Sequence, residues 1–285
     1  MSSFSADWLA LREPYDARAR NPAVLGAAAA LVADYPLIRV VDLACGIGSM
    51  LRALRPHLAG RQMWRLIDNN PDLLAFARAV TTISSALTVE LRALDLNSSL
   101  NAALVGSIDL VTASALFDLV SESWLDRLLS KIVKRHLPVY ATLTYDGRAE
   151  IDPADPLDAA IIAAANAHQR TDKGFGPALG PTAVPAAIAR FESMQYSVTS
   201  GISDWPIGPN DREIQMKIFA VWANAAERFS GLSHPDRVDW LSRRRDAVIA
   251  GCSSIRIGHV DFLATPTEIL RFCDKPESET EQKSF

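Results

Sequence analysis

The amino-acid sequence predicts an α/β fold, doubly wound around a mostly parallel, seven-stranded sheet. Three observations lead to this fold class. From Ile38 onward, apolar runs of strand length alternate with segments of helical period, as in a parallel sheet that is covered on both faces. The stretch VVDLACGIGSMLRAL, Val40 to Leu54, reads as a strand, a glycine turn and the start of a helix. Acidic residues recur near the ends of successive predicted strands, at the edge where such sheets bind ligands.

The strands are predicted where short apolar runs are bounded by turn residues. Five of these runs lie in the first half of the chain and two follow much later. The predicted strands are Arg39–Asp42, Met63–Asp68, Thr88–Leu94, Ile108–Ala113, Val139–Thr144, Tyr196–Ile202 and Ile255–Leu263.

Helices are expected between and after these strands. Asn70 followed by Pro71 is typical of an N-cap and the first helical position. The apolar run Ala23 to Ala33 is too short to span a bilayer and reads as a buried helix. Later helical periods are Ala183–Met194, Asp211–Phe229 and Pro235–Ala250.

No long polar linker divides the chain, so we expect one large domain with additions. Residues 1–36 would form an N-terminal helical lid. Residues 37–273 would form the main domain, with helical insertions at 151–181 and 209–251. The polar and charged residues 274–285 would form a disordered tail.

The composition is that of an ordinary soluble protein, with 49% hydrophobic and 22% charged residues among 285. A net charge of -4 gives no basic footprint, so we expect no nucleic acid and no membrane as a partner. Three cysteines without pairing or metal spacing favour a reducing cytoplasm. Charged residues that precede any long apolar run argue against a signal peptide.

Four acidic residues, Asp42, Asp68, Asp95 and Asp109, fall near the carboxyl ends of predicted strands. Asp42 precedes the glycine turn, where a carboxylate can meet a cationic amine. Asp68 stands where doubly wound folds place a carboxylate for ribose hydroxyls, and Asp95 could accept a hydrogen bond from an adenine amino group. Each one alone is more often a cap or turn residue, but their common register with the strands favours a ligand site.

The sequence does not match two other nucleotide-binding motifs. A P-loop needs a lysine after its second glycine, and neither glycine turn carries one. A dinucleotide fingerprint needs a third small residue where Leu51 stands, and it has no use for a carboxylate at Asp42.

VVDLACGIGSML resembles the first motif of the class I, Rossmann-like methyltransferases that depend on S-adenosylmethionine. LIDNNPDLL resembles their second motif, and ALDLN and IDLVTASALFDLV resemble the third and fourth. The resemblance covers about Val40 to Asp146, and the chain is also similar to a group of bacterial methyltransferase-like proteins. It departs from the usual motif at Ala44, where the first small residue is alanine.

The resemblance implies S-adenosyl-L-methionine as the cofactor. Asp42 to Gly48 would line its methionyl part, Asp68 with Asn69 would hold the ribose, and Asp95 with Leu96 would meet the adenine edge. The cofactor residues that it implies are Asp42, Ala44, Gly46, Gly48, Asp68, Asn69, Asp95, Leu96, Ser114 and Phe117, the last two on the sulfonium side.

The N-terminal segment Trp8 to Asn21 is expected to fold over the cofactor. Arg12, Tyr15 and Arg18 would then face the carboxylate of the cofactor or an anionic substrate. An ordinary solvated helix face would show the same residues.

The segment NAHQRTDK is expected to continue a helix, on which two stripes begin apolar and end polar. We interpret their ends as a wall of an acceptor site, although a helix face that runs into solvent would look alike. Tyr145 and Asp146 would form the opposite wall. The predicted substrate residues are Tyr145, Asp146, Asn166, His168, Gln169 and Lys173.

The sequence therefore indicates in-line methyl transfer from S-adenosylmethionine to a small polar molecule, catalysed by alignment and exclusion of water. A general base helps only an acceptor that keeps its proton near neutral pH. His168 is the first candidate, Asp118 the second, and Tyr145 would orient the acceptor. The alternative is a protein of this fold that has lost catalysis and serves as a binding or scaffold partner.

The remaining features are expected to be structural. The run Arg243 to Arg245 reads as a solvated helix face, and the tryptophans Trp205, Trp222 and Trp240 as packing of the C-terminal helices. The histidines lack ligand spacing, so no metal is expected.

Overall fold

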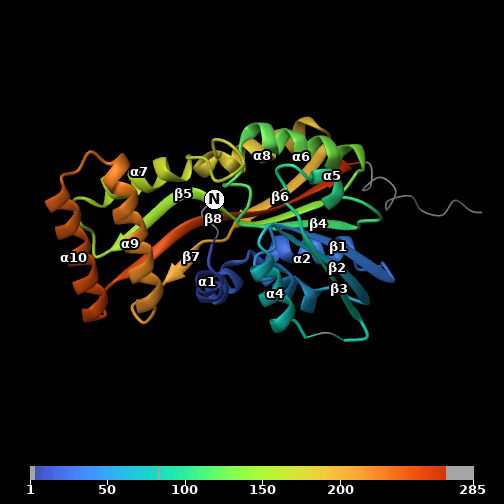
Figure 1. Cartoon of the computed structure of the whole chain (residues 1–285), viewed down its shortest axis with the longest axis horizontal. Coiled ribbons are helices and arrows are strands. Elements are labelled where there is room, and N and C mark those ends of the chain that lie inside the picture. The colour runs from blue at the N-terminus through green and yellow to red at the C-terminus, as the bar shows by residue number, and fades with distance from the viewer. Residues whose placement is uncertain (1–3, 83, 268–285) are drawn as a thin grey trace, which may run out of the picture.

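The computed structural model describes residues 4–82 and 84–267, and its central feature is a mixed, mostly parallel sheet (Figure 1). The strand order is β3-β2-β1-β4-β5-β8-β6, and a short strand, β7, pairs with β8 outside this path. Strands β1 to β5 run parallel, whereas β8 is antiparallel to both β5 and β6. The doubly wound α/β fold is confirmed, and β7 is an eighth strand beyond the seven predicted.

The strands overlap all seven predicted runs. The largest difference is in β5, which continues well beyond the predicted end at Thr144. The strands are β1 (Leu37–Leu43), β2 (Arg61–Asp68), β3 (Leu87–Ala93), β4 (Leu110–Ser114), β5 (Val139–Asp152), β6 (Tyr196–Ile202), β7 (Trp205–Ile207) and β8 (Ser254–Pro266).

Helices cover both faces of the sheet because its central strands are apolar on both sides. One face packs against α5 (Leu100–Ala103), α6 (Glu122–Lys134) and α8 (Ala183–Ser193). The other face packs against α2 (Pro22–Leu31), α3 (Ser49–Leu54) and α4 (Pro71–Val80). Asn70 is the N-cap of α4 and Pro71 its first residue, as predicted. Two short 3-10 turns are Arg55–His57 and Gly180–Thr182.

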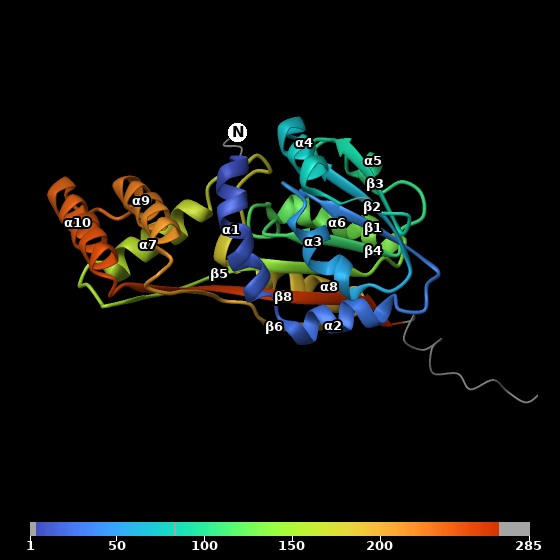
Figure 2. The same ribbon diagram turned by 90° about the horizontal axis from the view of Figure 1, so that it is seen from below.

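Strands β5 and β8 form a long antiparallel pair that runs the length of the molecule (Figure 2). Their far end carries α7 (Asp158–Gln169), α9 (Arg212–Phe229) and α10 (His234–Ala250). These helices share a second core with the outer part of the pair, in which Ile161, Phe219 and Trp240 are fully buried. The two segments predicted as helical insertions thus meet in one cluster of helices.

Helix α1 (Ala6–Ala19) lies between the sheet and this helical cluster (Figure 2). Arg52 of α3 donates to both carboxylate oxygens of Glu13, at 2.6 Å each, and Tyr15 donates to Asp211 beside α9 at 2.9 Å. Of the predicted lid, α1 bridges the two halves, whereas α2 covers the sheet. The predicted disordered tail, residues 274–285, lies outside the described residues.

The prediction of a solvated face for Arg243 to Arg245 is wrong at its central residue. The Arg244 side chain is 2% exposed, and its Nη2 donates to Asp158 of α7 at 2.6 Å. Arg243 is half exposed and pairs with Asp155, and Arg245 is exposed. Two acidic residues near the start of α7 draw α10 against it, which the helical period of α10 alone could not indicate.

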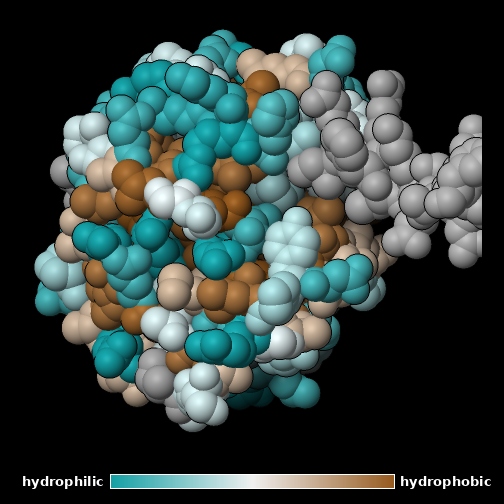
Figure 3. Space-filling view, turned by 90° about the vertical axis from the view of Figure 1, so that its right-hand side faces the viewer, coloured by the Kyte–Doolittle hydropathy of each residue, from teal (hydrophilic) through white to brown (hydrophobic). Residues whose placement is uncertain are grey.

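Of the tryptophans, Trp240 packs in the helical core and donates to Asp158 at 2.8 Å, as expected of a packing residue. Within residues 4–82 and 84–267, none of the helices combines the length and apolar character needed to cross a bilayer. Figure 3 shows the face at the amino ends of the parallel strands, where hydrophobic residues are interrupted by hydrophilic side chains.

Candidate functional site

Two adjoining cavities open at the carboxyl edge of the parallel strands. The first, of about 180 Å³, lies over the ends of β1, β2 and β4. The second, of about 470 Å³, lies between α1, the β5–β8 pair, α7 and α9. Phe4, Arg12, Ala115 and Leu119 line both, so the two cavities adjoin at these residues.

The glycine turn after β1 forms the floor of the first cavity. Ala44 and Gly46 line it, and both have left-handed backbone, with φ of 52°. Ala115, after β4, also lines it with φ of 50°. Non-glycine residues in this region cost conformational energy and are commonest at functional sites. Gly48 does not line the cavity; it caps α3 with φ of 80° and its N–H donates to the Cys45 carbonyl.

Asp68 ends β2 at the wall of the first cavity and is 8% exposed. Its Oδ2 accepts the Gly46 N–H and its Oδ1 accepts the Asn70 N–H, both at 2.9 Å. Burial raises the pKa of Asp68, while the backbone N–H groups act in the opposite direction. The Asn69 N–H also bonds to this carboxylate, which has about four acceptor positions, so Asp68 keeps capacity for one hydroxyl of a ligand.

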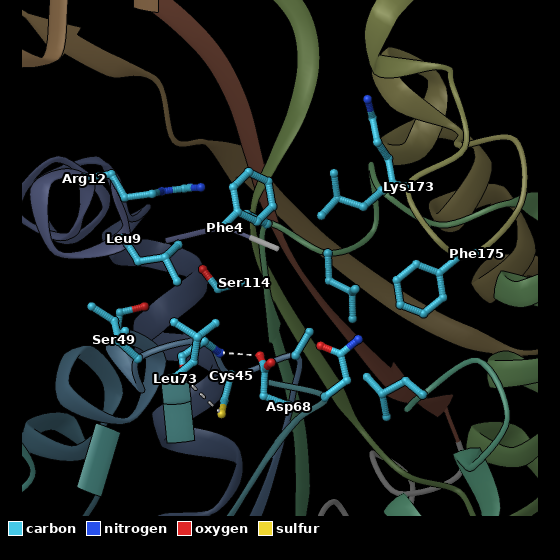
Figure 4. Close-up of a pocket in the computed structure, with 18 of the residues that line it drawn as sticks. Phe4, Leu9, Arg12, Cys45, Ser49, Asp68, Leu73, Ser114, Lys173 and Phe175 are labelled. Atoms are coloured by element: carbon cyan, nitrogen blue, oxygen red, sulfur yellow. Dashed lines mark hydrogen bonds between the residues drawn. The ribbon is translucent and has the colours of Figure 1, made fainter. Parts of the chain in front are cut away.

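The loop after β3 adds Asp95 and Leu96 to the cavity, beside Asn69. Trp124 of α6 holds this loop by donating to the Leu96 carbonyl at 3.1 Å. The ring of Phe175 stands edge-on to Trp124, at 5.1 Å between centroids, and lines the cavity opposite α1 (Figure 4). Phe175 was missed from the sequence, where the glycines on either side indicated only a loop.

Asp42 lies beneath the turn, fully buried, and does not line the cavity. Its Oδ1 accepts a hydrogen bond from Thr112 at 2.8 Å, and its Oδ2 has no partner among the described residues. Burial raises the pKa of Asp42 to about 7. Phe117, also predicted at the cofactor, packs instead in the sheet core against Phe262, whereas Ser114 lines the first cavity.

Helix α1 closes the first cavity from one side, with Leu9 and Arg12 pointing into it (Figure 4). A Cβ on Gly46 would lie 3.1 Å from Leu9 Cδ1, so the helix rests on the turn. Arg12 donates twice to Asp16, at 3.0 and 3.1 Å, and lies 5.0 Å over the Trp205 ring.

The other two residues predicted to act from α1 line neither cavity. Tyr15 is bonded to Asp211, and the guanidinium of Arg18 lies 4.6 Å from the Tyr15 ring.

The second cavity has mostly apolar and aromatic walls. Trp8 comes from α1, Trp222 from α9 and Trp205 from β7, with Ile218 and Ile257 beside them. Trp205 and Trp222 were expected only to pack helices. Their convergence could not be predicted from the sequence, because it depends on how the segment after β6 folds back on β8.

A few polar groups face this second cavity. Asp118, which follows β4, has an Oδ1 without a partner in the described structure, and burial raises its pKa to about 6. His259 of β8 is buried, which lowers its pKa to about 3. Burial and the nearby Lys173 also lower the pKa of His168. His259 was not among the predicted site residues, although the sequence places it on the last strand.

The predicted acceptor residues divide between several places. Tyr145, His168 and Gln169 line the second cavity, and Lys173 lines the first. Asn166 lines neither: it accepts the Tyr145 hydroxyl at 2.6 Å and donates to the Gly147 carbonyl at 3.0 Å.

Asp146 also lies outside both cavities and is bonded to Arg148 at 2.7 Å. Helix α7 ends at Gln169, so Asp172 and Lys173 do not continue its stripes.

Among the described residues, no three His, Cys, Asp or Glu side chains come together as a metal site. Cys45 lines the first cavity, but burial and the charges of Asp42 and Asp68 raise the pKa of its thiol, so it is not a reactive thiolate.

Residues 40–138, from β1 to the start of β5, match the family model described as a methyltransferase domain. They contain the glycine turn, Asp68, Asp95 and Asp118, but not the residues of α7, α9 or β8. No curated protein sequence matches the chain.

Solved structures share the fold over most of the chain. A cyclopropane-fatty-acyl-phospholipid synthase-like protein from Lactobacillus casei is 16% identical, with a TM-score of 0.51, over 92% of this chain and 94% of that one. The YcgJ protein from Bacillus subtilis is 14% identical, with a TM-score of 0.50, over 86% and 99%. Loganic acid methyltransferase, solved with SAH, is 9% identical, with a TM-score of 0.52, over 93% and 96%.

Proposed function

We propose that this chain, whose residues 40–138 belong to the methyltransferase domain family, transfers a methyl group from S-adenosyl-L-methionine to a small molecule. The observation that carries the proposal is the pair of adjoining cavities. One has the acidic strand ends and glycine turn suited to an adenosyl cofactor, and the other is a separate chamber that meets it at Arg12 and Ala115.

The residues of the first cavity fit the cofactor. Asp68 retains acceptor capacity for a ribose hydroxyl, and Asn69, Asp95 and Leu96 would lie beside the adenine. Asp42 lies beneath the turn and outside the cavity, so it would support the turn without contacting the cofactor. Gly48 would act only by shaping the turn, and Phe117 only by packing in the sheet core against Phe262.

The cofactor, when bound, supplies a methyl group on a sulfonium that is a good leaving group. The protein must then hold the acceptor in line and exclude water, which is the work of proximity. Leu9, Phe4 and Arg12 would shield the junction of the cavities. Asp118 and His168 face the acceptor side, and Tyr145 is held by Asn166, so these three keep their proposed roles of base and orienter.

The acceptor is proposed to be a small molecule in the second cavity. The tryptophan and isoleucine walls suit an acceptor with an apolar body better than the small polar molecule predicted from the sequence. Lys173, Asn166 and Asp146 do not face this cavity, so the proposed contacts are through Tyr145, His168 and Gln169. The cytoplasmic location stays a prediction from the cysteine content.

The test is titration calorimetry with S-adenosylhomocysteine. Wild type should bind, and Asp68→Ala should bind about 10-fold to 100-fold more weakly, because a charge-assisted hydrogen bond contributes about 1.5–3 kcal/mol. Asp126→Ala, an exposed carboxylate on α6, is the matched control and should bind like wild type. Absence of binding by wild type would refute the proposal, and binding without turnover on any acceptor would favour a scaffold role.

A further inference from the structure

Arg12 lines both cavities, and one end of its guanidinium is available to a ligand. Its Nε and Nη2 donate to Asp16 at 3.0 and 3.1 Å, which fixes the plane of the group. Nη1 has no acceptor among residues 4–82 and 84–267, and the side chain is 12% exposed. Figure 4 shows Arg12 pointing from α1 across the pocket. The N–H groups of Nη1 can therefore donate to an oxygen of a bound molecule.

This free end of Arg12 lies at the wall of the second cavity. Asp16, which takes the other edge of the guanidinium, lines the first cavity but not the second. The Arg12 Cζ is 5.0 Å from the centre of the Trp205 ring, and Trp205 lines the second cavity but not the first. Burial lowers the pKa of His259, also at the second cavity, to about 3, and the charge of Arg12 adds to this effect. An oxygen on Nη1 would thus belong to the acceptor rather than to the cofactor.

The charged groups around the second cavity favour an anionic acceptor. Burial raises the pKa of Asp118 to about 6, while its own backbone N–H and the charges of Arg12 and Lys173 act in the opposite direction. Two cations thus oppose Asp118, whose Oδ1 is buried and therefore not available to a ligand. A bound sulfonium adds a further positive charge, so a carboxylate on the acceptor would be attracted and a cationic amine repelled.

A carboxylate also suits a cavity with few groups that could remove a proton. It is already ionised at neutral pH, so its methylation needs no base. Asp118 Oδ1 is buried, and His259 is a poor base because burial lowers its pKa to about 3. The proposed base role of His168 would then apply to acceptors that keep their proton.

The body of the ligand must match walls that are flat and apolar. Trp8, Trp205 and Trp222 stand around the cavity, and Trp222 is 9% exposed. Aromatic walls of this kind favour a planar ring system, which stacks on or packs edge-on against them.

We infer that the acceptor is a carboxylate on an aromatic, otherwise apolar molecule, with one carboxylate oxygen on Arg12 Nη1 and the ring among the three tryptophans. The inference rests on the proposed function. The other carboxylate oxygen forms the new bond to the methyl carbon, the C–S bond breaks, and its electron pair stays on sulfur. No proton moves, and the products are a methyl ester and the neutral thioether.

The experiment compares four probes with one ring system: 2-naphthoate, 2-acetylnaphthalene, 2-naphthol and 2-naphthylmethylamine. Their binding to the full chain is measured by calorimetry at neutral pH with saturating S-adenosylhomocysteine. We expect 2-naphthoate to bind at least about tenfold more tightly than the others, because it alone makes a charge-assisted hydrogen bond to Arg12. With S-adenosylmethionine in place of the product, mass spectrometry should detect methyl 2-naphthoate.

Variants separate the carboxylate contact from the ring contact. Arg12→Gln should weaken 2-naphthoate about tenfold, yet change the affinities for 2-acetylnaphthalene and S-adenosylhomocysteine less than about threefold. Trp222→Ala should weaken both of these naphthalenes, because it removes a wall of the ring site. Arg18→Gln is the matched control, since Arg18 is an exposed arginine of α1 that lines neither cavity. Should Arg12→Gln fail to fold, the preference of wild type for 2-naphthoate over the neutral 2-acetylnaphthalene decides.

Equal or tighter binding of any other probe than 2-naphthoate would overturn the inference, as would no binding of any probe by a protein that binds S-adenosylhomocysteine. So would an unchanged 2-naphthoate affinity in Arg12→Gln, or tight binding of 2-naphthoate without formation of its ester. A tenfold loss of S-adenosylhomocysteine affinity in Arg12→Gln would assign Nη1 to the cofactor carboxylate instead. Failure of wild type to bind S-adenosylhomocysteine would refute the proposed function itself, and that result is read independently of the four probes.

Discussion

Asp42 makes stability depend on pH in a direction opposite to most carboxylates. Burial raises its folded-state pKa to about 7, so the folded chain binds this proton more tightly than the unfolded chain. The cost of ionising it begins above about pH 4 and is complete above about pH 7.

Replacing Asp42 by Asn should therefore help most at high pH, because the amide oxygen can still accept from Thr112. The free energy of unfolding of Asp42→Asn, relative to wild type, should rise between pH 5 and pH 8 by at most about 3 kcal/mol. Urea titrations at both values measure it, with the exposed Asp126→Asn as control. If this difference in the free energy of unfolding stays constant or falls between pH 5 and pH 8, ionisation of Asp42 does not destabilise the folded chain.

Gly46 is the residue at which the cavity floor, the lid and the backbone conformation meet. With φ of +52° and a Cβ position 3.1 Å from Leu9, alanine there would be strained and would press on α1. Gly46→Ala should lose about 1 kcal/mol of stability and bind S-adenosylhomocysteine at least tenfold more weakly.

Gly26 provides the contrast, since it lies in α2 with open space around it. Gly26→Ala should gain about 0.5–1 kcal/mol and bind like wild type. Thermal unfolding with and without ligand measures both variants. Equal affinities in the two would mean that the turn does not contact the cofactor.

At the scale of single residues, the sequence was informative for polar residues that directly follow a predicted strand. Asp68, Asn69, Asp95 and Leu96 were predicted together and line one cavity, because parallel strands bring their carboxyl ends to one edge. The prediction of Asp109 near a carboxyl end is wrong, because it precedes the amino end of β4 and accepts the Arg39 N–H at 2.7 Å. Their contacts with a cofactor stay a prediction. His259 and Trp222 could not be placed, since their convergence depends on distant chain segments.

At the level of the element, the hydrophobic periodicity of α7 did not determine where the helix ends. Its stripes were extended through Lys173, but the helix ends at Gln169, where the Thr171 N–H and hydroxyl both donate to the His168 carbonyl. Lys173 then turns back to the same carbonyl and reaches the first cavity. Side-chain hydroxyl and ammonium groups that donate to the last carbonyls of a helix are a weaker sequence signal for its end than glycine or proline.

The contact between α7 and α10 includes one buried ion pair, between Arg244 and Asp158. Arg244→Met would leave Asp158, which is 14% exposed, without its charged partner. We expect a loss of about 3–5 kcal/mol, because an unpaired buried charge is costly. Arg245→Met, one residue along on the exposed side, should change stability by less than about 0.5 kcal/mol. Urea denaturation compares the two, and a similar small loss in both would show that the pair is well solvated.

For the whole molecule, the strands and the mostly parallel sheet followed from the regular alternation of strands and helices. The long β5–β8 pair did not, because its outer half pairs residues that are about a hundred positions apart, such as Ala149 with Ile257. Strand propensity is a local property and does not show which distant strands pair. The second cavity is built on this part of the fold, which is why the acceptor side was the least predictable part of the site.

Helix α1 joins the two halves, and its attachment can be loosened without touching either cavity. Glu13 receives two hydrogen bonds from Arg52, which also donates to the Ile47 carbonyl of the glycine turn at 2.8 Å. Glu13→Gln removes the charge and one of the paired bonds but leaves Arg52 on the turn. At about 25% exposure the pair should contribute about 1 kcal/mol, so amide exchange across Ala6–Ala19 should quicken about fivefold while β1 is unchanged.

Saturating S-adenosylhomocysteine should restore protection in this variant, since Leu9 and Arg12 line the first cavity and would pack against the bound molecule. Hydrogen–deuterium exchange with mass spectrometry follows both effects. Glu213→Gln, which breaks a solvent-exposed pair with Lys217 on α9, is the control and should leave α1 unaffected. If ligand protects the sheet edge but not α1 in wild type or variant, the helix packs between the two halves without acting as a lid.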